Sequence, residues 1–140
     1  MVHDAAAQYQ GACLCGAVRM RVSHAEPHVS ACHCNICRHW GGGPFLSLEC
    51  RQAPEFDGLE HVATFASSDW AERGFCTRCG THLFYRLKSA EFYAVPVGLF
   101  AEGASWPFTL QVFIDAKPEN YAFANATDTM TGEEVFKAWS

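Results

Sequence analysis

The sequence has little positive charge, no long hydrophobic run and no segment typical of a secretion signal. Lysine and arginine number 10 against 15 acidic residues, so the formal net charge is −5 and nucleic acid is not an expected partner. The most apolar run, residues 92–101, is broken by Pro96 and Gly98, and it is well short of the roughly 20 residues that cross a bilayer. The first ten residues lack the basic and apolar regions of a signal peptide. These absences argue against a membrane partner and predict a reducing, cytoplasmic location.

Charge of either sign is sparse, and this argues for a folded chain. Charged residues make up 18% of the sequence and hydrophobic residues 49%, a balance that excludes intrinsic disorder. A length of 140 residues fits one ordinary domain. We therefore expect a flexible N-terminal tail at residues 1–8 and a single domain at residues 9–140.

Apolar residues alternate with polar ones along several short segments, which is the period of a half-buried strand. The alternating apolar sets are Val18, Met20 and Val22, then Leu83, Tyr85 and Leu87, then Phe108, Leu110, Val112 and Ile114. Proline and glycine separate these segments. The pattern predicts a mainly β fold of short antiparallel strands.

One helix is predicted, at the C-terminus. Thr131 and Glu134 form the T-x-x-E pattern of a capping box, and Met130 could pack against Val135 as a hydrophobic staple. We expect this helix to dock on the core through Val135, Phe136 and Trp139 and to carry no chemistry.

The unusual feature is cysteine, with 8 residues, of which seven fall into three tight groups. The groups are Cys13 and Cys15; Cys32, Cys34 and Cys37; and Cys76 and Cys79. In an extended C-x-C the two side chains face the same way, and a C-x-x-C turn directs two sulfurs at one ion. The first and third groups together therefore predict a closed four-thiolate zinc site with a structural role.

The middle group brings three thiolates together and leaves one corner of a tetrahedral metal unfilled. An open corner is typical of a catalytic zinc. In the alternative interpretation Cys50 fills that corner and both metal sites are purely structural. Strand alternation, however, places Cys50 with Leu46 and Leu48 on an apolar face. His33 is expected to project away from the metal. His39 lies near enough to compete for the corner, but we expect both histidines to support the ligands or to face solvent.

At these positions the sequence resembles the glutathione-dependent formaldehyde-activating enzymes (Gfa), a family whose relatives include the centromere protein V group. The matching stretches are residues 11–18, 32–38, 73–81, 97–100 and 113–118. The resemblance implies a zinc-braced β-tent fold, similar to that of methionine sulfoxide reductase B. It also implies two zinc ions per chain, a structural one on Cys13, Cys15, Cys76 and Cys79 and a catalytic one on Cys32, Cys34 and Cys37.

The activity that the resemblance implies is that of a carbon–sulfur lyase, the joining of glutathione and formaldehyde to S-(hydroxymethyl)glutathione. The partners would be a small-molecule thiol such as glutathione and a small aldehyde. Two other functions remain open: a non-catalytic thiol carrier, and a purely structural zinc module that binds another protein. The family match gives no information on the segment from Asn120 onward.

The substrate-binding candidates lie next to the cysteine groups in the sequence. Arg38, Arg73 and Arg78 could balance the charge of the thiolates, or they could be ordinary surface charges. Trp40 could form a stacking wall, or it could belong to the core beside a plain glycine turn. No paired carboxylates or Ser-His-Asp order stand out, so the sequence identifies no general base.

Overall fold

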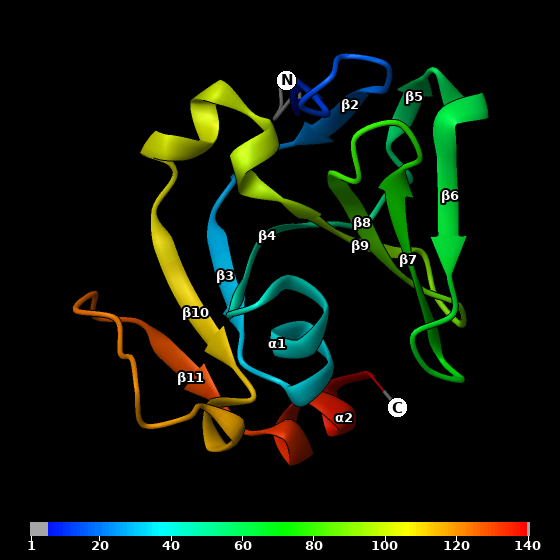
Figure 1. Cartoon of the computed structure of the whole chain (residues 1–140). Coiled ribbons are helices and arrows are strands. Elements are labelled where there is room, and N and C mark those ends of the chain that lie inside the picture. Colours follow the sequence, from blue (N-terminus) through cyan, green and yellow to red (C-terminus); the bar gives the residue numbers. More distant parts are fainter. Residues whose placement is uncertain (1–5, 140) are drawn as a thin grey trace.

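The computed structural model describes residues 6–139, with the side chain of Trp139 outside the description, and its strands form two sheets (Figure 1). The smaller sheet has the order β1-β2-β5, with β1 at Ala7–Ala12, β2 at Arg19–His24 and β5 at Glu55–Asp57. The larger sheet has eight strands in the order β11-β10-β3-β4-β9-β8-β7-β6. The prediction of a mainly β fold is confirmed.

The larger sheet contributes residues to two of the three cysteine groups of the sequence, Cys32 and Cys76. Their bounds are β3 Val29–Cys32, β4 Phe45–Cys50, β6 Val62–Phe65, β7 Ala71–Cys76, β8 His82–Leu87, β9 Phe92–Pro96, β10 Phe108–Val112 and β11 Asp128–Met130. Short 3₁₀ helices lie in the connections at Leu59–His61, Val97–Leu99, Ala101–Ser105 and Ile114–Ala116. Within residues 6–139 no helix is long and apolar enough to cross a membrane.

Most strand pairs are antiparallel, as the sequence predicts, but β10 runs parallel to both of its neighbours, β3 and β11. Alternation predicts which face of a strand is buried and contains no information about strand direction. On β10 even the face differs from the prediction, because Gln111 is buried while Leu110 is only half-buried.

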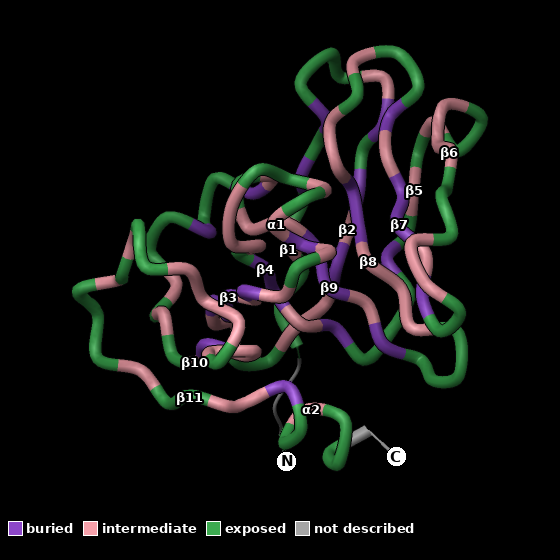
Figure 2. Tube along the Cα trace, turned by 60° about the horizontal axis from the view of Figure 1, so that its bottom comes forward, coloured by how far each residue is buried: buried purple, intermediate pink, exposed green. Residues whose placement is uncertain are grey.

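The core lies between the two sheets. Met20 and Val22 of β2 are buried as predicted, and they belong to one apolar cluster with Leu48 of β4, Leu83 of β8 and Val95 of β9. Exposed residues concentrate in the connecting loops (Figure 2). Burial of these side chains from both sheets is the main term that stabilises the arrangement.

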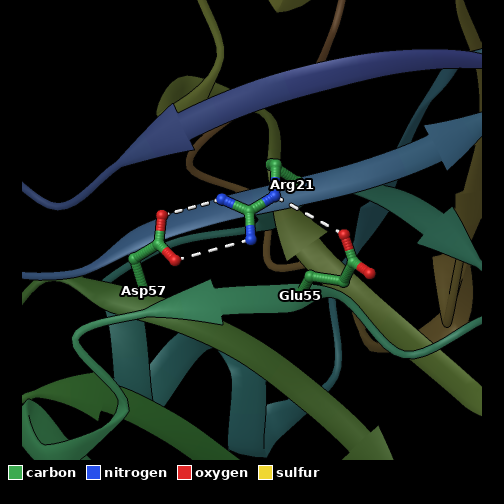
Figure 3. A network of polar contacts seen from close by, with 3 residues as sticks. All are labelled: Arg21, Glu55 and Asp57. Carbon is green, nitrogen blue, oxygen red and sulfur yellow. Dashed lines mark hydrogen bonds and ion pairs between the residues drawn. The ribbon is translucent and has the colours of Figure 1, made fainter.

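An ion-pair network joins the two strands at the open edge of the smaller sheet (Figure 3). Arg21 Nη1 of β2 donates to Asp57 Oδ2 of β5 at 2.8 Å, and its Nε donates to Glu55 Oε1 at 3.5 Å. The hydrogen bond and charge of Arg21 lower the pKa of Asp57. Because the network is exposed to water, we assign it a role in fixing strand register and little stability.

Strand β1 carries the chain into the first cysteine group and overlaps the expected tail. Ala7 pairs with His24 and Gln8 pairs with Ser23, so these two residues of the expected tail at 1–8 are in a strand, while residues 1–5 lie outside the described residues. Further along, a Cβ at Gly11 would lie 2.7 Å from the Leu99 carbonyl oxygen. Only glycine allows this close approach, which holds the start of the cysteine segment against the 3₁₀ helix that follows β9.

Helix α1, Asn35–Gly41, was not predicted and corrects the expectation of a single helix. Its N-cap is Cys34, whose Sγ accepts a hydrogen bond from the Cys37 backbone N–H at 3.3 Å. It ends at Gly42, which has a φ of 86° and whose N–H donates to the Arg38 carbonyl. Cysteine is not among the usual N-cap residues, so the sequence pattern did not indicate a helix start.

Helix α2, Gly132–Trp139, begins with the predicted capping box. The Glu134 N–H donates to Thr131 Oγ1 at 3.2 Å, and the Thr131 N–H donates to Glu134 Oε1 at 2.7 Å. The expected docking of its apolar side on the core is wrong for Phe136, which is 54% exposed and packs edge-on against Trp70 and Phe113. The expectation for Trp139 concerns a side chain outside the described part of the chain.

Candidate metal centres and the adjoining cavity

The first cysteine group joins the end of the smaller sheet to the larger one. Cys13 and Cys15 follow β1, Cys76 ends β7, and Cys79 lies in the turn before β8; their sulfurs all lie within 4.8 Å of one another. A tetrahedral zinc with Zn–S bonds of about 2.3 Å separates its sulfurs by about 3.8 Å. The Cys13–Cys15 and Cys15–Cys76 sulfur distances of 3.6 and 3.8 Å match that requirement.

Hydrogen bonds hold this group in place, and the pKa is lowered for Cys13 and Cys79 but raised to about 11 for Cys15. The Val18 N–H donates to Cys13 Sγ at 3.3 Å, and the Arg78 N–H donates to Cys76 Sγ at 3.4 Å. Hydrogen bonds from Thr81 lower the pKa of Cys79 to about 5. Gly80, with a φ of 78°, allows the turn that brings Cys76 and Cys79 together. The group can therefore hold one metal ion with four thiolates.

The second group lies where β3 passes into α1. Cys32 is the last residue of β3, Cys34 caps α1 and Cys37 lies in its first turn, and the three sulfurs are within 4.8 Å of one another. Contacts from the Cys32 and Cys37 thiols, with a smaller contribution from the charge of Arg73, lower the pKa of Cys34 to about 2, while the pKa values of Cys32 and Cys37 are raised because the three thiols share protons. The arrangement can offer three sulfur donors to one metal ion.

Cys50 lies away from both groups. It is 2% exposed within the apolar core, next to Leu48, and it is not one of the grouped sulfurs. Burial raises the pKa of its thiol to about 12, which keeps it protonated. The environment is that of a small hydrophobic residue, and it does not favour Cys50 as a fourth ligand.

Arg73 connects the second group to strand β7. Its Nη2 donates to Cys37 Sγ at 3.3 Å and its Nε donates to Ser67 Oγ at 3.2 Å. The guanidinium carbon also lies 5.1 Å from the centre of the Tyr85 ring, and burial raises the pKa of Tyr85 to about 12. Arg73 is 4% exposed, so its charge is balanced by the cysteine group and not by solvent.

A cavity of about 600 Å³ opens between the two cysteine groups. Cys37, Trp40 and Arg73 line one part of it, and Leu14, Gly80 and Thr81, from the loops of the first group, line another. Phe45 and Leu46 add apolar wall. Such a volume and lining are typical of a small-molecule site.

The three substrate-binding candidates from the sequence do not share one site. Trp40 and Arg73 line the cavity beside Cys37, whereas Arg38 lines a second cavity of about 560 Å³ together with His39 and Tyr121. Arg38 Nε donates to the His33 carbonyl at 3.0 Å. Arg78 is exposed.

The two histidines of the second group differ in their surroundings. His33 is completely buried, with its ring nitrogens on Gln111 and Tyr121, and His39 is exposed. Neither belongs to the grouped ligand atoms.

His82 is a cavity residue that the sequence analysis missed. Its ring stacks on Trp40 with centres 4.8 Å apart and an angle of 27° between planes. Burial, and secondly the charge of Arg73, lower its pKa, so the imidazole is neutral at pH 7 and can accept a proton. The only sequence signal was its place three residues after Cys79.

Comparisons with known proteins agree with the cysteine pattern. The model of the family described as glutathione-dependent formaldehyde-activating enzyme matches residues 8–116. An uncharacterized lyase of Schizosaccharomyces pombe is 40% identical over 132 residues, which is 94% of this chain and 96% of that protein. A protein of Halomonas elongata, provisionally named a glutathione-dependent formaldehyde-activating enzyme, is 32% identical over 84 residues, 54% of each chain.

A solved structure shares the fold. The crystal structure of a Rhodobacter sphaeroides protein superposes with a TM-score of 0.53 at 23% identity, covering 71% of this chain and 99% of that one.

Proposed function

Because the chain belongs to the glutathione-dependent formaldehyde-activating family, we propose that it is a zinc-dependent carbon–sulfur lyase. In the synthetic direction it joins a thiol such as glutathione to formaldehyde or a similar small aldehyde. The carbon–sulfur bond forms, the carbonyl π bond breaks, and the thiol proton ends on the former carbonyl oxygen. Atoms and electrons balance without an oxidant or reductant.

The metal assignment divides the cysteines between two roles. Cys13, Cys15, Cys76 and Cys79 hold a structural zinc that ties β1 to the β7–β8 turn, since four thiolates complete a tetrahedral shell. Cys32, Cys34 and Cys37 hold the catalytic zinc and leave one position for the substrate thiol. We assign the reaction to the cytoplasm, where thiolate ligands stay reduced.

The observation that carries the proposal is that Cys37, a member of the three-sulfur group, lines the cavity with Trp40, Arg73 and His82. When bound, the zinc supplies positive charge that keeps a substrate thiol ionised at neutral pH. Phe45 and Leu46 provide apolar wall against which the thiol and the aldehyde can pack. The cavity is large enough to hold both reactants side by side.

Positioning accounts for most of the acceleration in this scheme. A free thiol with a pKa near 8.5 is a few per cent ionised at pH 7, so complete ionisation gains at most about 30-fold, or about 2 kcal/mol. Ionisation by a metal also lowers the nucleophilicity of the sulfur. Holding thiol and aldehyde together in the cavity must supply the rest.

The chain provides charge balance and a proton acceptor. Three thiolates outweigh one Zn²⁺ by a single negative charge, and the Arg73 guanidinium at Cys37 Sγ offsets it. A ring nitrogen of His82 takes the thiol proton and returns it to the aldehyde oxygen, because burial and Arg73 keep this imidazole neutral.

Kinetics distinguish the lyase from a thiol carrier, because thiols add to formaldehyde without a catalyst. The experiment measures adduct formation at protein concentrations far below that of the thiol, with Cys34→Ser as the matched variant that lacks one sulfur of the open site. The proposal expects a rate proportional to protein and lost in Cys34→Ser. A rate equal to the protein-free background would favour the carrier.

A further inference from the structure

His33, which stands between two candidate ligands, Cys32 and Cys34, has a hydrogen-bond partner on every polar atom. Its backbone N–H donates to the Val112 carbonyl at 3.1 Å, and its carbonyl accepts from Arg38 Nε at 3.0 Å. Its ring nitrogens Nε2 and Nδ1 lie 2.8 Å from Gln111 Oε1 and 2.7 Å from the Tyr121 hydroxyl. The residue is 0% exposed.

The partners fix one arrangement of protons along this network. Gln111 Nε2 donates to Thr127 Oγ1 at 3.0 Å, so the Gln111 amide oxygen is the end that faces His33. An amide oxygen only accepts, so His33 Nε2 carries the proton and donates it. His33 Nδ1 is then an acceptor, and the Tyr121 hydroxyl donates to it. Both ring nitrogens of His33 therefore have a matched partner, as a buried polar group requires.

Tyr121 is itself held from two sides. Lys117 Nζ donates to the carbonyls of Tyr121 and Pro118, at 2.6 and 2.9 Å. The Tyr121 ring stacks on the His33 ring with centres 5.5 Å apart. The centre of the Phe123 ring lies 5.9 Å from that of the His33 ring. The imidazole is thus fixed both by hydrogen bonds and by aromatic packing.

Tyr121, Phe123 and Thr127 lie outside residues 8–116, the part of the chain that the family model matches. The C-terminal segment therefore reaches the second cysteine group through its contacts with His33 and with Gln111. Because successive side chains of an extended segment point to opposite sides, fixing the His33 ring fixes the directions in which Cys32 and Cys34 project.

We propose that Gln111 and Tyr121 are positioning residues for the second cysteine group: they clamp His33 and so set the metal affinity and geometry of Cys32 and Cys34. This inference rests on the proposed function, because it requires a metal at that group. Loss of a partner that orients metal ligands typically costs about 10- to 100-fold in metal affinity. The effect is confined to the second group, since the clamp makes no contact with the first.

The test uses Co²⁺ as the probe, because its visible bands report ligand geometry, together with competition by a coloured chelator. Tyr121→Phe removes only the hydroxyl, and Gln111→Met removes the amide at similar volume. Tyr9→Phe is the matched control, a half-buried tyrosine of β1 whose ring packs edge-on against Trp106 at 5.2 Å. Melting temperatures are measured in parallel, and Thr127→Val replaces either variant that fails to fold.

The expected result is that both clamp variants release the more weakly held ion about 10- to 100-fold more readily, with altered Co²⁺ bands. The first ion stays bound as tightly as in the unchanged chain and in Tyr9→Phe. The melting temperature of the clamp variants falls by a few degrees, because a buried ring nitrogen of His33 loses its partner. Unchanged affinity and bands would overturn the inference, and so would equal weakening of both ions. A single ion bound by the unchanged chain would instead overturn the proposed function, so the two failures are distinguishable.

Discussion

Arg73 Nη2 of strand β7 donates a hydrogen bond to Cys37 Sγ of helix α1 at 3.3 Å, and this contact places a buried positive charge on the three-cysteine group. Hydrogen bonds to charged groups contribute about 1.5–3 kcal/mol. Arg73→Met is therefore expected to lower kcat/KM and second-site metal affinity by about 10- to 100-fold. Arg73→Lys keeps the charge but loses the planar guanidinium. Its kcat/KM and metal affinity should lie between those of the unchanged chain and those of Arg73→Met.

The matched control for Arg73 is Arg78→Ala, in the turn between Cys76 and Cys79. Arg78 is exposed, so its removal should leave kcat/KM within about twofold. Steady-state kinetics and chelator competition measure both effects. Equal losses of kcat/KM and of metal affinity in Arg73→Met and Arg78→Ala would contradict the role assigned to the buried guanidinium of Arg73.

Metal counting separates the two cysteine groups. We expect about two zinc ions per chain, because the closed and the open cysteine site each hold one. Cys34→Ser should keep the fold and bind one. Cys76→Ser should instead unfold the chain, since the first group ties the two sheets together. Elemental analysis with circular dichroism measures both.

Cys50→Ala serves as the control for metal counting, because Cys50 is buried in the apolar core and lies outside both groups. It should keep the full zinc content. If Cys50→Ala lost an ion, or if Cys34→Ser unfolded as Cys76→Ser does, the second group would be a brace completed by Cys50.

His82 predicts the acid side of the pH–rate profile. Burial and the charge of Arg73 lower its pKa below the ordinary value of 6.5, so the neutral, proton-accepting form dominates at pH 7 and above. The rate should stay flat down to pH 7 and fall only as the pH drops through this lowered pKa. His82→Gln should reduce kcat by about 100-fold and remove that acid limb.

Trp40→Phe tests whether the effect of His82→Gln on the pH–rate profile comes only from the loss of ring stacking between His82 and Trp40. It keeps an aromatic ring against His82 and should therefore retain the acid limb of the profile. An acid limb that persisted unchanged in His82→Gln would exclude His82 as the proton acceptor.

The capping box of α2 predicts a stability effect without an effect on chemistry. Thr131→Ala removes the acceptor for the Glu134 N–H and should cost about 1 kcal/mol, or about 3 °C in melting temperature. Zinc content and kcat/KM should not change. Thermal unfolding checks the first expectation, and a lowered zinc content would contradict the second.

Local sequence patterns predicted the features of this chain that depend on spacing alone. C-x-C and C-x-x-C spacing was enough to group the cysteines, and the T-x-x-E pattern marked the start of α2, because both depend on residues a few positions apart. Helix α1 escaped prediction because a cysteine sulfur caps it.

Features that depend on tertiary packing were not predictable in this way. Arg73 reaches Cys37 across 36 residues of sequence and His33 reaches Tyr121 across 88. The alternation along β10 predicts that Gln111 faces solvent. It is buried instead, where its amide oxygen accepts from His33. The exposure of Phe136 depends on its position beside Trp70 and Phe113, which no local pattern contains.

The central claim is that the Cys32, Cys34 and Cys37 site has room for a sulfur from outside the chain. Zinc K-edge X-ray absorption on the purified protein, before and after adding glutathione, tests it most directly. The account predicts an average of about 3.5 sulfurs per zinc, from one closed and one open site, rising to about 4 when the thiol is added. Four sulfurs per zinc before any thiol is added would contradict it.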